Sequence, residues 1–171
     1  SFKHIKDKIK WCLMDLNDLS SCLKVIEEVK PDYVFHLGAQ SYPSASFVYP
    51  EETIRTNILG TYNLLEAIRI VRDRTITKDN FPLGIYEPVI HVCSSSEVYG
   101  LVKKEDVPIK ETQAFNPANP YAVGKVGTDM IALMYYTNYK LKIIRTRMFT
   151  HTGPRRTMLS AEVNFAKQIA E

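Results

Sequence analysis

Short apolar runs alternate along the chain with longer segments in which apolar residues recur every three or four positions. Runs of the first kind are typical of β-strands buried on both faces, and they cover residues 9–14, 32–37, 88–93 and 141–149. Segments of the second kind predict amphipathic helices, and they cover residues 19–29, 51–72, 121–138 and 160–170. The polar stretch 75–87, which contains Pro82 and Gly84, predicts a loop.

This alternation predicts parallel β-α-β units and therefore one doubly wound α/β sheet. The 171 residues are enough for one domain with a buried core. Ligands of such sheets bind beyond the carboxyl ends of the strands. We therefore expect the chemistry to follow the last residues of the apolar runs, which are Met14, Leu37, Cys93 and Phe149.

The composition narrows the classes of function only slightly. A net charge of +3 is too weak a bias to indicate binding to nucleic acid or to a membrane. No apolar stretch approaches the ~20 residues that span a bilayer, and the N-terminus lacks the apolar region of a signal peptide. Two of the three cysteines, Cys12 and Cys93, lie in apolar runs, so we expect buried free thiols and a reducing, cytoplasmic location.

Two motifs of reactive side chains surround the third apolar run. Ser94–Gly100 reads SSSEVYG and follows the run directly, and Pro120–Lys125 reads PYAVGK and opens the next helix. Tyr121 and Lys125 are four positions apart and share one helical face. An ammonium beside a phenol favours the phenolate, so we predict a lowered pKa and general acid/base character for Tyr121.

These motifs together resemble the extended short-chain dehydrogenase/reductase family, and in particular its nucleotide-sugar 4,6-dehydratases, epimerases and reductases. The resemblance implies a Rossmann-type fold and a catalytic role for Ser95, with Tyr121 as the catalytic base and Lys125 as its helper on the nicotinamide ribose. It further implies that Asp15 and Leu16 contact adenine. The stretch that would pass the cofactor's phosphates and ribose consists of Leu37, Gly38, Ala39, Gln40 and Ser41.

Three nearby residues are expected to have structural roles. We interpret His36 as a packed strand residue. The resemblance extends to Asn57–Thr61, which matches the family's N-x-x-G-T on the helix that lines the site. There Asn57 is expected to be structural and Gly60 to permit close packing.

Two branches of the family compete for this sequence. The stretch 38–41 and the segment His151–Arg156 resemble GDP-mannose 4,6-dehydratase, in which His151 and Arg156 would reach NADP and the pair Arg155–Arg156 would lie at a tetramer interface. The segments 130–133, 144–147 and 164–169 resemble GDP-4-keto-6-deoxy-mannose reductase instead. Thr150 and Glu52 depart from the pattern, since Asn and a cofactor-contacting tyrosine are usual there.

For a dehydratase the resemblance implies that Tyr121 and Ser95 act at the sugar O4, and that Glu97 removes the proton from C5 and helps to expel water from C6. A reductase can also carry Glu at this position, so Glu97 does not choose between the reactions. Two further hypotheses are a dinucleotide-binding sensor without catalysis and an inactive fragment.

The family's glycine-rich motif G-x-x-G-x-x-G is absent, because none of the seven glycines forms that spacing. We therefore expect the first β-α-β unit before Ser1 and most of the substrate domain after Glu171. Residues 1–171 would form a partial NAD(P)-binding Rossmann domain, with the substrate-binding region beginning near 150–171. The resemblance favours NADP, with NAD possible, a GDP-hexose substrate and a homo-oligomer, either dimer or tetramer.

Overall fold

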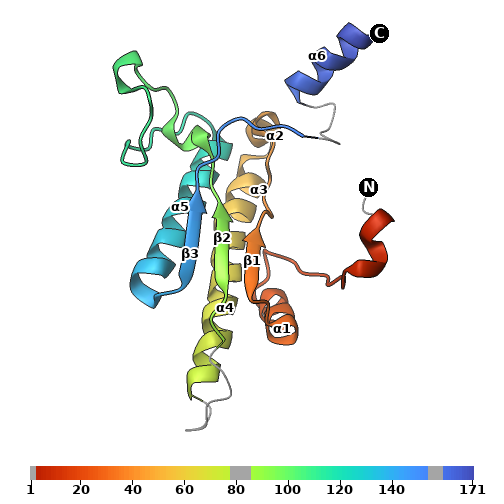
Figure 1. The fold of residues 1–171 in the computed structure, drawn as a ribbon. Coiled ribbons are helices and arrows are strands. Elements are labelled where there is room, and N and C mark those ends of the chain that lie inside the picture. Colours follow the sequence, from red (N-terminus) through yellow and green to blue (C-terminus); the bar gives the residue numbers. More distant parts are fainter. Residues whose placement is uncertain (1–2, 78–85, 154–159) are drawn as a thin grey trace.

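The computed structural model describes residues 3–77, 86–153 and 160–171. Six α-helices and three β-strands follow one another in these residues (Figure 1). The helices are α1 Leu19–Val29, α2 Pro43–Val48, α3 Pro50–Ile54, α4 Gly60–Thr77, α5 Pro120–Tyr139 and α6 Ala161–Ala170. The strands are β1 Tyr33–His36, β2 Val89–Cys93 and β3 Lys142–Thr146. Among the described residues, no helix is long and apolar enough to cross a membrane.

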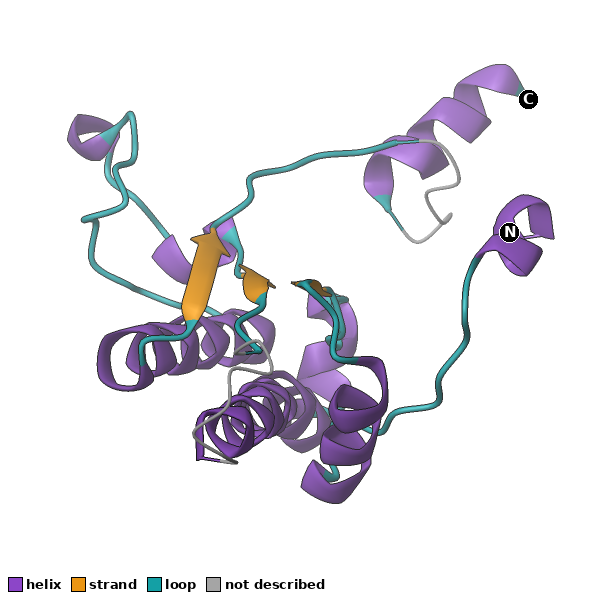
Figure 2. Cartoon of the chain, turned by 60° about the horizontal axis from the view of Figure 1, so that its bottom comes forward, coloured by secondary structure: helices purple, strands orange, loops and turns teal. Residues whose placement is uncertain are grey.

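The strands form one parallel sheet in the order β1-β2-β3. In register, Val34 lies beside Ile90, and Ile90 lies beside Ile143. The helices α1, α4 and α5 cover one face of this sheet (Figure 2). This arrangement confirms the predicted Rossmann-type α/β fold with a parallel sheet.

The core lies between the sheet and this helical layer. Its centre is α4, whose Leu65 and Ile68 are fully buried against Ile90 and Val92 of β2. Cys22 and Ile26 of α1 complete the cluster on one side. Burying one side chain of this size stabilises a fold by roughly 1.5–3 kcal/mol. Because α4 buries several such side chains, it contributes much of the stability of the contact between the sheet and the helical layer.

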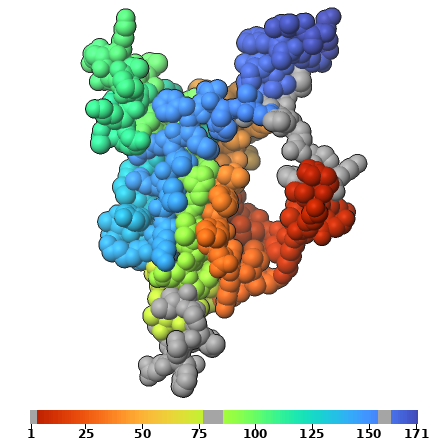
Figure 3. Space-filling model, in the orientation of Figure 1, coloured from red at the N-terminus to blue at the C-terminus, as the bar shows by residue number. Residues whose placement is uncertain are grey.

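The opposite face of the described sheet is apolar and open to solvent. Its exposed side chains alternate along the strands with the buried ones, as the two-residue period of a strand requires. They include Tyr33 and Phe35 of β1 and Ile144 of β3, whose exposed fractions are 69%, 67% and 55%. Figure 3 shows that residues 3–14 and α6 project from the body of the molecule.

The strand predicted over residues 9–14 is wrong. The segment has no regular structure after the 3₁₀ turn Lys3–Lys8, and its Trp11 and Leu13 are 59% and 99% exposed. A strand requires a neighbour that accepts its backbone hydrogen bonds, and no strand within the described ranges lies beside this segment. The expectation that Cys12 is buried fails for the same reason, whereas Cys22 and Cys93 are buried free thiols.

The helix predicted over 51–72 is confirmed in position but differs in form. It starts with α3, passes through a π-helical turn at Arg55–Leu59 and continues as α4 to Thr77, three residues into the predicted loop. Residues 78–85 lie outside the described residues. The fourth predicted strand is shorter than expected, since β3 ends at Thr146. The short helix α2, which opens on Pro43, was not predicted.

Candidate active site

The candidate site lies beyond the carboxyl end of β2, where Ser94 and Ser95 follow the strand. Ser95 caps a 3₁₀ turn over Ser96–Tyr99, and its Oγ accepts a hydrogen bond from the Glu97 amide at 3.2 Å. The backbone amide of Ser96 donates to the carbonyl of Met148 at 3.0 Å. The ladder between β2 and β3 therefore extends beyond both strands and fixes the start of this turn.

Helix α5 begins on the other side of the site with a side-chain cap. Asn119 Oδ1 accepts a hydrogen bond from the Ala122 amide at 2.8 Å, and Pro120 occupies the first helical position. The side-chain nitrogen Nδ2 of Asn119 donates to Glu97 Oε2 at 3.0 Å. Asn119 thus ties Glu97 to the start of α5. Sequence reasoning missed this residue, although Asn directly before Pro at a helix start is a recognisable cap signal.

Tyr121 and Ser95 meet in the structure, as the two motifs predicted. Burial of the phenol raises the pKa of Tyr121 and the charge of Glu97 raises it further, while hydrogen bonding with the Ser95 side chain lowers it by less than burial raises it. The net pKa of Tyr121 lies above its ordinary value. The predicted lowering by Lys125 is therefore wrong for this arrangement, because burial disfavours the charged phenolate more than the serine stabilises it.

Lys125 lies one helical turn after Tyr121 and is buried, with 7% of its surface exposed. Its Nζ donates to the Cys93 carbonyl at 2.8 Å and lies 5.9 Å from the centre of the Tyr121 ring. Burial lowers the pKa of Lys125. The ammonium is thus held at the end of β2 by a backbone oxygen, beside the tyrosine rather than against its hydroxyl.

The loop after β1 is fastened to the helical layer by one buried side chain. Asn57 Oδ1 accepts a hydrogen bond from the Gln40 amide at 2.8 Å, and Asn57 Nδ2 donates to the Gln40 carbonyl at 3.1 Å. A Cβ on Gly124 of α5 would lie 3.1 Å from Asn57 Cβ, so only glycine allows this approach without a shift. The predicted structural role of Asn57 is confirmed.

Leu16 connects the loop that follows residues 9–14 with the loop that follows β1. A Cβ on Gly38 would lie 2.6 Å from Leu16 Cδ1, and one on Gly60 would lie 3.1 Å from Leu16 Cβ. Asn63 Nδ2 donates to the Leu16 carbonyl at 2.7 Å. The predicted close packing at Gly60 is confirmed, and two motifs that are far apart in the sequence lie side by side.

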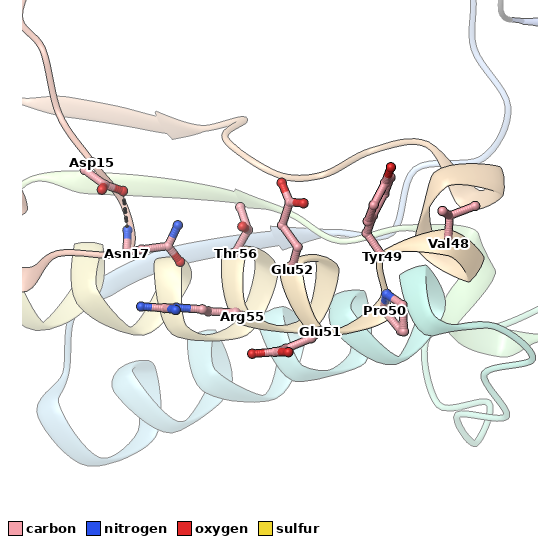
Figure 4. A pocket seen from close by; sticks show the side chains of 9 residues that line it. All are labelled: Asp15, Asn17, Val48, Tyr49, Pro50, Glu51, Glu52, Arg55 and Thr56. Carbon is pink, nitrogen blue, oxygen red and sulfur yellow. Dashed lines mark hydrogen bonds between the residues drawn. The ribbon is translucent and has the colours of Figure 1, made fainter.

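A cavity of about 650 Å³ lies next to Asp15, between its loop and the start of the long helix. Figure 4 shows Asp15 and Asn17 on one wall and the residues from Val48 to Thr56 on the other, with Arg55 extending toward Asn17. Asp15 Oδ1 accepts a hydrogen bond from the Asn17 backbone amide at 2.8 Å, which holds the carboxylate at the rim of the cavity. The lining includes neither Ser95 nor Tyr121.

His36 is a packed residue, as predicted. Its ring nitrogen Nε2 shares a hydrogen bond of 3.0 Å with Thr61 Oγ1, and 7% of its surface is exposed. Burial, together with the nearby charge of Lys125, lowers the pKa of His36 to about 4. The imidazole is therefore neutral at physiological pH and serves packing at the end of β1.

Comparison with known proteins decides the family. A family model described as GDP-mannose 4,6 dehydratase matches residues 1–171. The chain belongs to this family.

Members of the GDP-mannose 4,6 dehydratase family and of its reductase relatives match most of the chain. GDP-mannose 4,6-dehydratase of Vibrio cholerae is 39% identical over 142 residues, which are 83% of this chain and 35% of that protein. GDP-6-deoxy-D-mannose reductase of Pseudomonas aeruginosa is 32% identical over 140 residues, 82% of this chain and 42% of that protein. A solved structure of RMD from Pseudomonas aeruginosa complexed with NADPH superposes with a TM-score of 0.79 at 30% identity, over 93% of this chain and 49% of that one. The chain thus spans between about a third and a half of the length of these relatives.

The structure describes one of the last two residues that the family resemblance indicated. His151 is exposed, and its Nδ1 lies 2.9 Å from the Phe149 carbonyl. Arg156, with its neighbour Arg155, lies outside the described residues. Over residues 3–77, 86–153 and 160–171, no cluster of three or more His, Cys, Asp or Glu could hold a metal ion.

Proposed function

We propose that this chain forms the catalytic part of an NAD(P)-dependent nucleotide-sugar enzyme, a GDP-mannose 4,6-dehydratase. The observation that carries the proposal is the meeting of Ser95, Tyr121 and Lys125 beyond β2, with Glu97 tied to the same helix start by Asn119. The names of the relatives support the same reaction. Residues 150–171 would begin the substrate-binding region, and the whole protein would act as a homo-oligomer.

The arrangement of the loops fits a dinucleotide. Gly38 is exposed and lacks a side chain where the loop after β1 passes Leu16, and Asn57 binds the Gln40 backbone, so the loop is held in place with its glycine open to a ligand. The cavity beside Asp15 offers carboxylates that accept hydrogen bonds from an adenine amine. Residues that would hold NADP, or NAD, are Asp15, Leu16, Leu37, Gly38, Ala39, Gln40, Ser41, Tyr121, Lys125, His151 and Arg156.

Bound nicotinamide would supply a site that accepts hydride from the sugar C4 and returns it to C6. Tyr121 takes the proton of the O4 hydroxyl, which becomes the 4-keto oxygen, and Ser95 donates a hydrogen bond to that oxygen. Because burial raises the pKa of Tyr121, the phenolate that takes this proton needs stabilisation from its surroundings. Glu97 then removes the C5 proton, which the keto group has acidified, and passes a proton to the C6 hydroxyl, which leaves as water.

The deciding experiment is Glu97→Gln in the full-length protein with GDP-mannose. The change keeps the shape and the contact with Asn119 but removes the basic oxygen pair. We expect turnover to fall by roughly 10²–10⁴-fold, the usual contribution of a positioned acid or base, and solvent deuterium no longer to enter C5. The matched control is Glu105→Gln, on an exposed turn at Lys104–Asp106, which should leave both readouts unchanged.

The second candidate reaction is reduction of a GDP-4-keto-6-deoxy sugar, favoured by the segment 164–169 and the Pseudomonas aeruginosa reductase. Reduction at C4 needs hydride, Tyr121 and Ser95 but no base at C5. In a reductase, Glu97→Gln would leave the rate on the 4-keto substrate within about tenfold. Solvent deuterium would enter C5 neither in the unchanged enzyme nor in the variant. A pure dinucleotide sensor would instead keep its cofactor affinity in Tyr121→Phe and have no turnover to lose.

A further inference from the structure

Arg147 lies just beyond the end of β3 and connects this strand end to three other segments of the chain. Its Nε donates to Asp129 Oδ2 on α5 at 2.8 Å. Its Nη1 donates to Tyr99 Oη at 3.0 Å and to the Glu111 carbonyl at 2.7 Å. Its guanidinium also lies over the Phe115 ring, 4.6 Å from the centre. With 15% of its side chain exposed, this arginine is an internal connection and not a surface charge.

We propose that Arg147 is a positioning residue that holds the turn carrying Ser95 and Glu97 at a fixed place relative to Tyr121 on α5. The inference rests on the proposed function of that site, because it assigns Arg147 a part in placing Glu97 for the reaction.

One end of the connection is the catalytic helix itself. Tyr121, Lys125 and Asp129 follow one another at intervals of four residues, so they occupy one face of α5. Asp129 is completely buried and accepts hydrogen bonds from both Arg145 and Arg147. Burial alone would raise the pKa of Asp129, but the two arginines outweigh it and the net pKa lies below the usual value. The carboxylate is therefore ionised and gives Arg147 a rigid anchor two turns from Tyr121.

The other end of the connection is the turn over Ser96–Tyr99. Tyr99 closes this turn, is 3% exposed and lies two residues after Glu97. The guanidinium lies 5.5 Å from the centre of the Tyr99 ring while its Nη1 binds the hydroxyl, so both the ring and its tip are held. A planar fork with several donors can satisfy these contacts together, and the single ammonium of lysine cannot.

The same arginine seats the loop that returns to α5. This loop extends beyond the carboxyl ends of the strands (Figure 1) and contributes the Glu111 carbonyl and the Phe115 ring to the Arg147 contacts. It touches the turn again where the Asn116 amide donates to the Val98 carbonyl at 2.9 Å. Gly100 permits this contact, since it has a φ of +59° and a Cβ there would lie 1.7 Å from the Asn116 carbonyl oxygen. The loop then leads to Asn119, which binds Glu97, so Arg147 supports Glu97 from both sides.

The test is Arg147→Lys in the full-length enzyme, with Arg145→Lys as the matched control. Both arginines bind Asp129, but the contacts to Tyr99 and Glu111 belong to Arg147. We expect kcat to fall by roughly 10–100-fold in Arg147→Lys, since misplacement of a reacting group by about 1 Å can cost about 10²-fold, while KM changes less than about threefold. Arg145→Lys should lower the melting temperature to a similar extent and leave kcat within about twofold.

A double-mutant cycle with Glu97→Gln separates positioning from a general loss of stability. If Arg147 acts through Glu97, Arg147→Lys in the Glu97→Gln background should cost less than about threefold in kcat, because the two changes disable the same step. Additive losses, or a fall in kcat for Arg145→Lys equal to that for Arg147→Lys, would overturn the inference. If Glu97→Gln alone leaves turnover unchanged, the proposed function fails instead. Should Arg147→Lys not fold, Tyr99→Phe removes the hydroxyl partner alone, and an unchanged kcat in that variant counts against the inference.

Discussion

Replacement of Asn57 by alanine tests whether one buried side chain holds the loop after β1. Asn57 is 1% exposed and makes two hydrogen bonds to the backbone of Gln40, which is itself half-buried. The carbonyl of Asn57, which Thr61 and Thr128 bind, is untouched by the change. The change therefore removes the hydrogen bonds between the π-helical turn and this loop, together with the packing of the side chain against Gly124 of α5.

The expected loss follows from these two bonds. A hydrogen bond contributes about 0.5–1.5 kcal/mol to stability, and a buried polar group left without a partner costs about 1–3 kcal/mol. The Gln40 backbone can regain water because the loop is partly exposed, so the lower figures apply. We expect Asn57→Ala to reduce the free energy of unfolding by about 1–3 kcal/mol.

Urea unfolding of the full-length protein measures this free energy, with an unchanged m-value as the sign that only stability has moved. Asn138→Ala is the matched control, because Asn138 is an exposed residue of α5, where the same substitution should change stability by under about 0.7 kcal/mol. Asn57→Asp keeps the acceptor for the Gln40 amide and should fall between the two. A loss in Asn57→Ala no larger than that in Asn138→Ala would refute the reasoning.

Three further predictions concern pH, the cofactor and assembly. The pKa of His36 is about 4 in the folded chain and about 6.5 when unfolded. The unfolded chain therefore binds a proton first as the pH drops from 6.5 to 4, and the free energy of unfolding should fall by up to ~3 kcal/mol over this range. Urea midpoints should show this pH dependence in the native protein and lose it in His36→Gln. The 171-residue chain by itself should bind NADP(H) poorly, because its seven glycines supply no phosphate-binding loop at a helix start; micromolar binding by calorimetry would contradict this. In the full-length protein, replacing Arg155 and Arg156 by alanine should weaken assembly or cofactor affinity, since paired guanidinium groups suit phosphate and carboxylate partners; unchanged oligomeric mass and affinity would show that both side chains are dispensable.

The amino-acid pattern was sufficient for much of the fold. The strands at 33–36, 89–93 and 142–146 and the helices α1, α5 and α6 occur where the apolar pattern predicted them, although one face of the strands is open to solvent and not buried as expected. Because parallel strands end at the same edge of the sheet, the order of the motifs along the chain was also enough to predict that Ser95 lies beside Tyr121. Periodicity records which faces of a segment are buried, and that information is local.

The tertiary structure decided what depends on partners distant in the sequence. Residues 9–14 have the composition of a strand but no neighbouring strand within the described part of the chain, so they stay irregular. The pKa of Tyr121 rises because burial, which no spacing reveals, outweighs the hydrogen bond with Ser95. The links from Asn119 to Glu97 and from Arg147 to Tyr99 join residues 22 and 48 positions apart. Hydrogen bonds of this kind form only when the completed fold brings donor and acceptor within reach. The reactive residues were therefore predictable from the sequence, whereas their positions and contacts depend on the packing of α5 against β2 and β3.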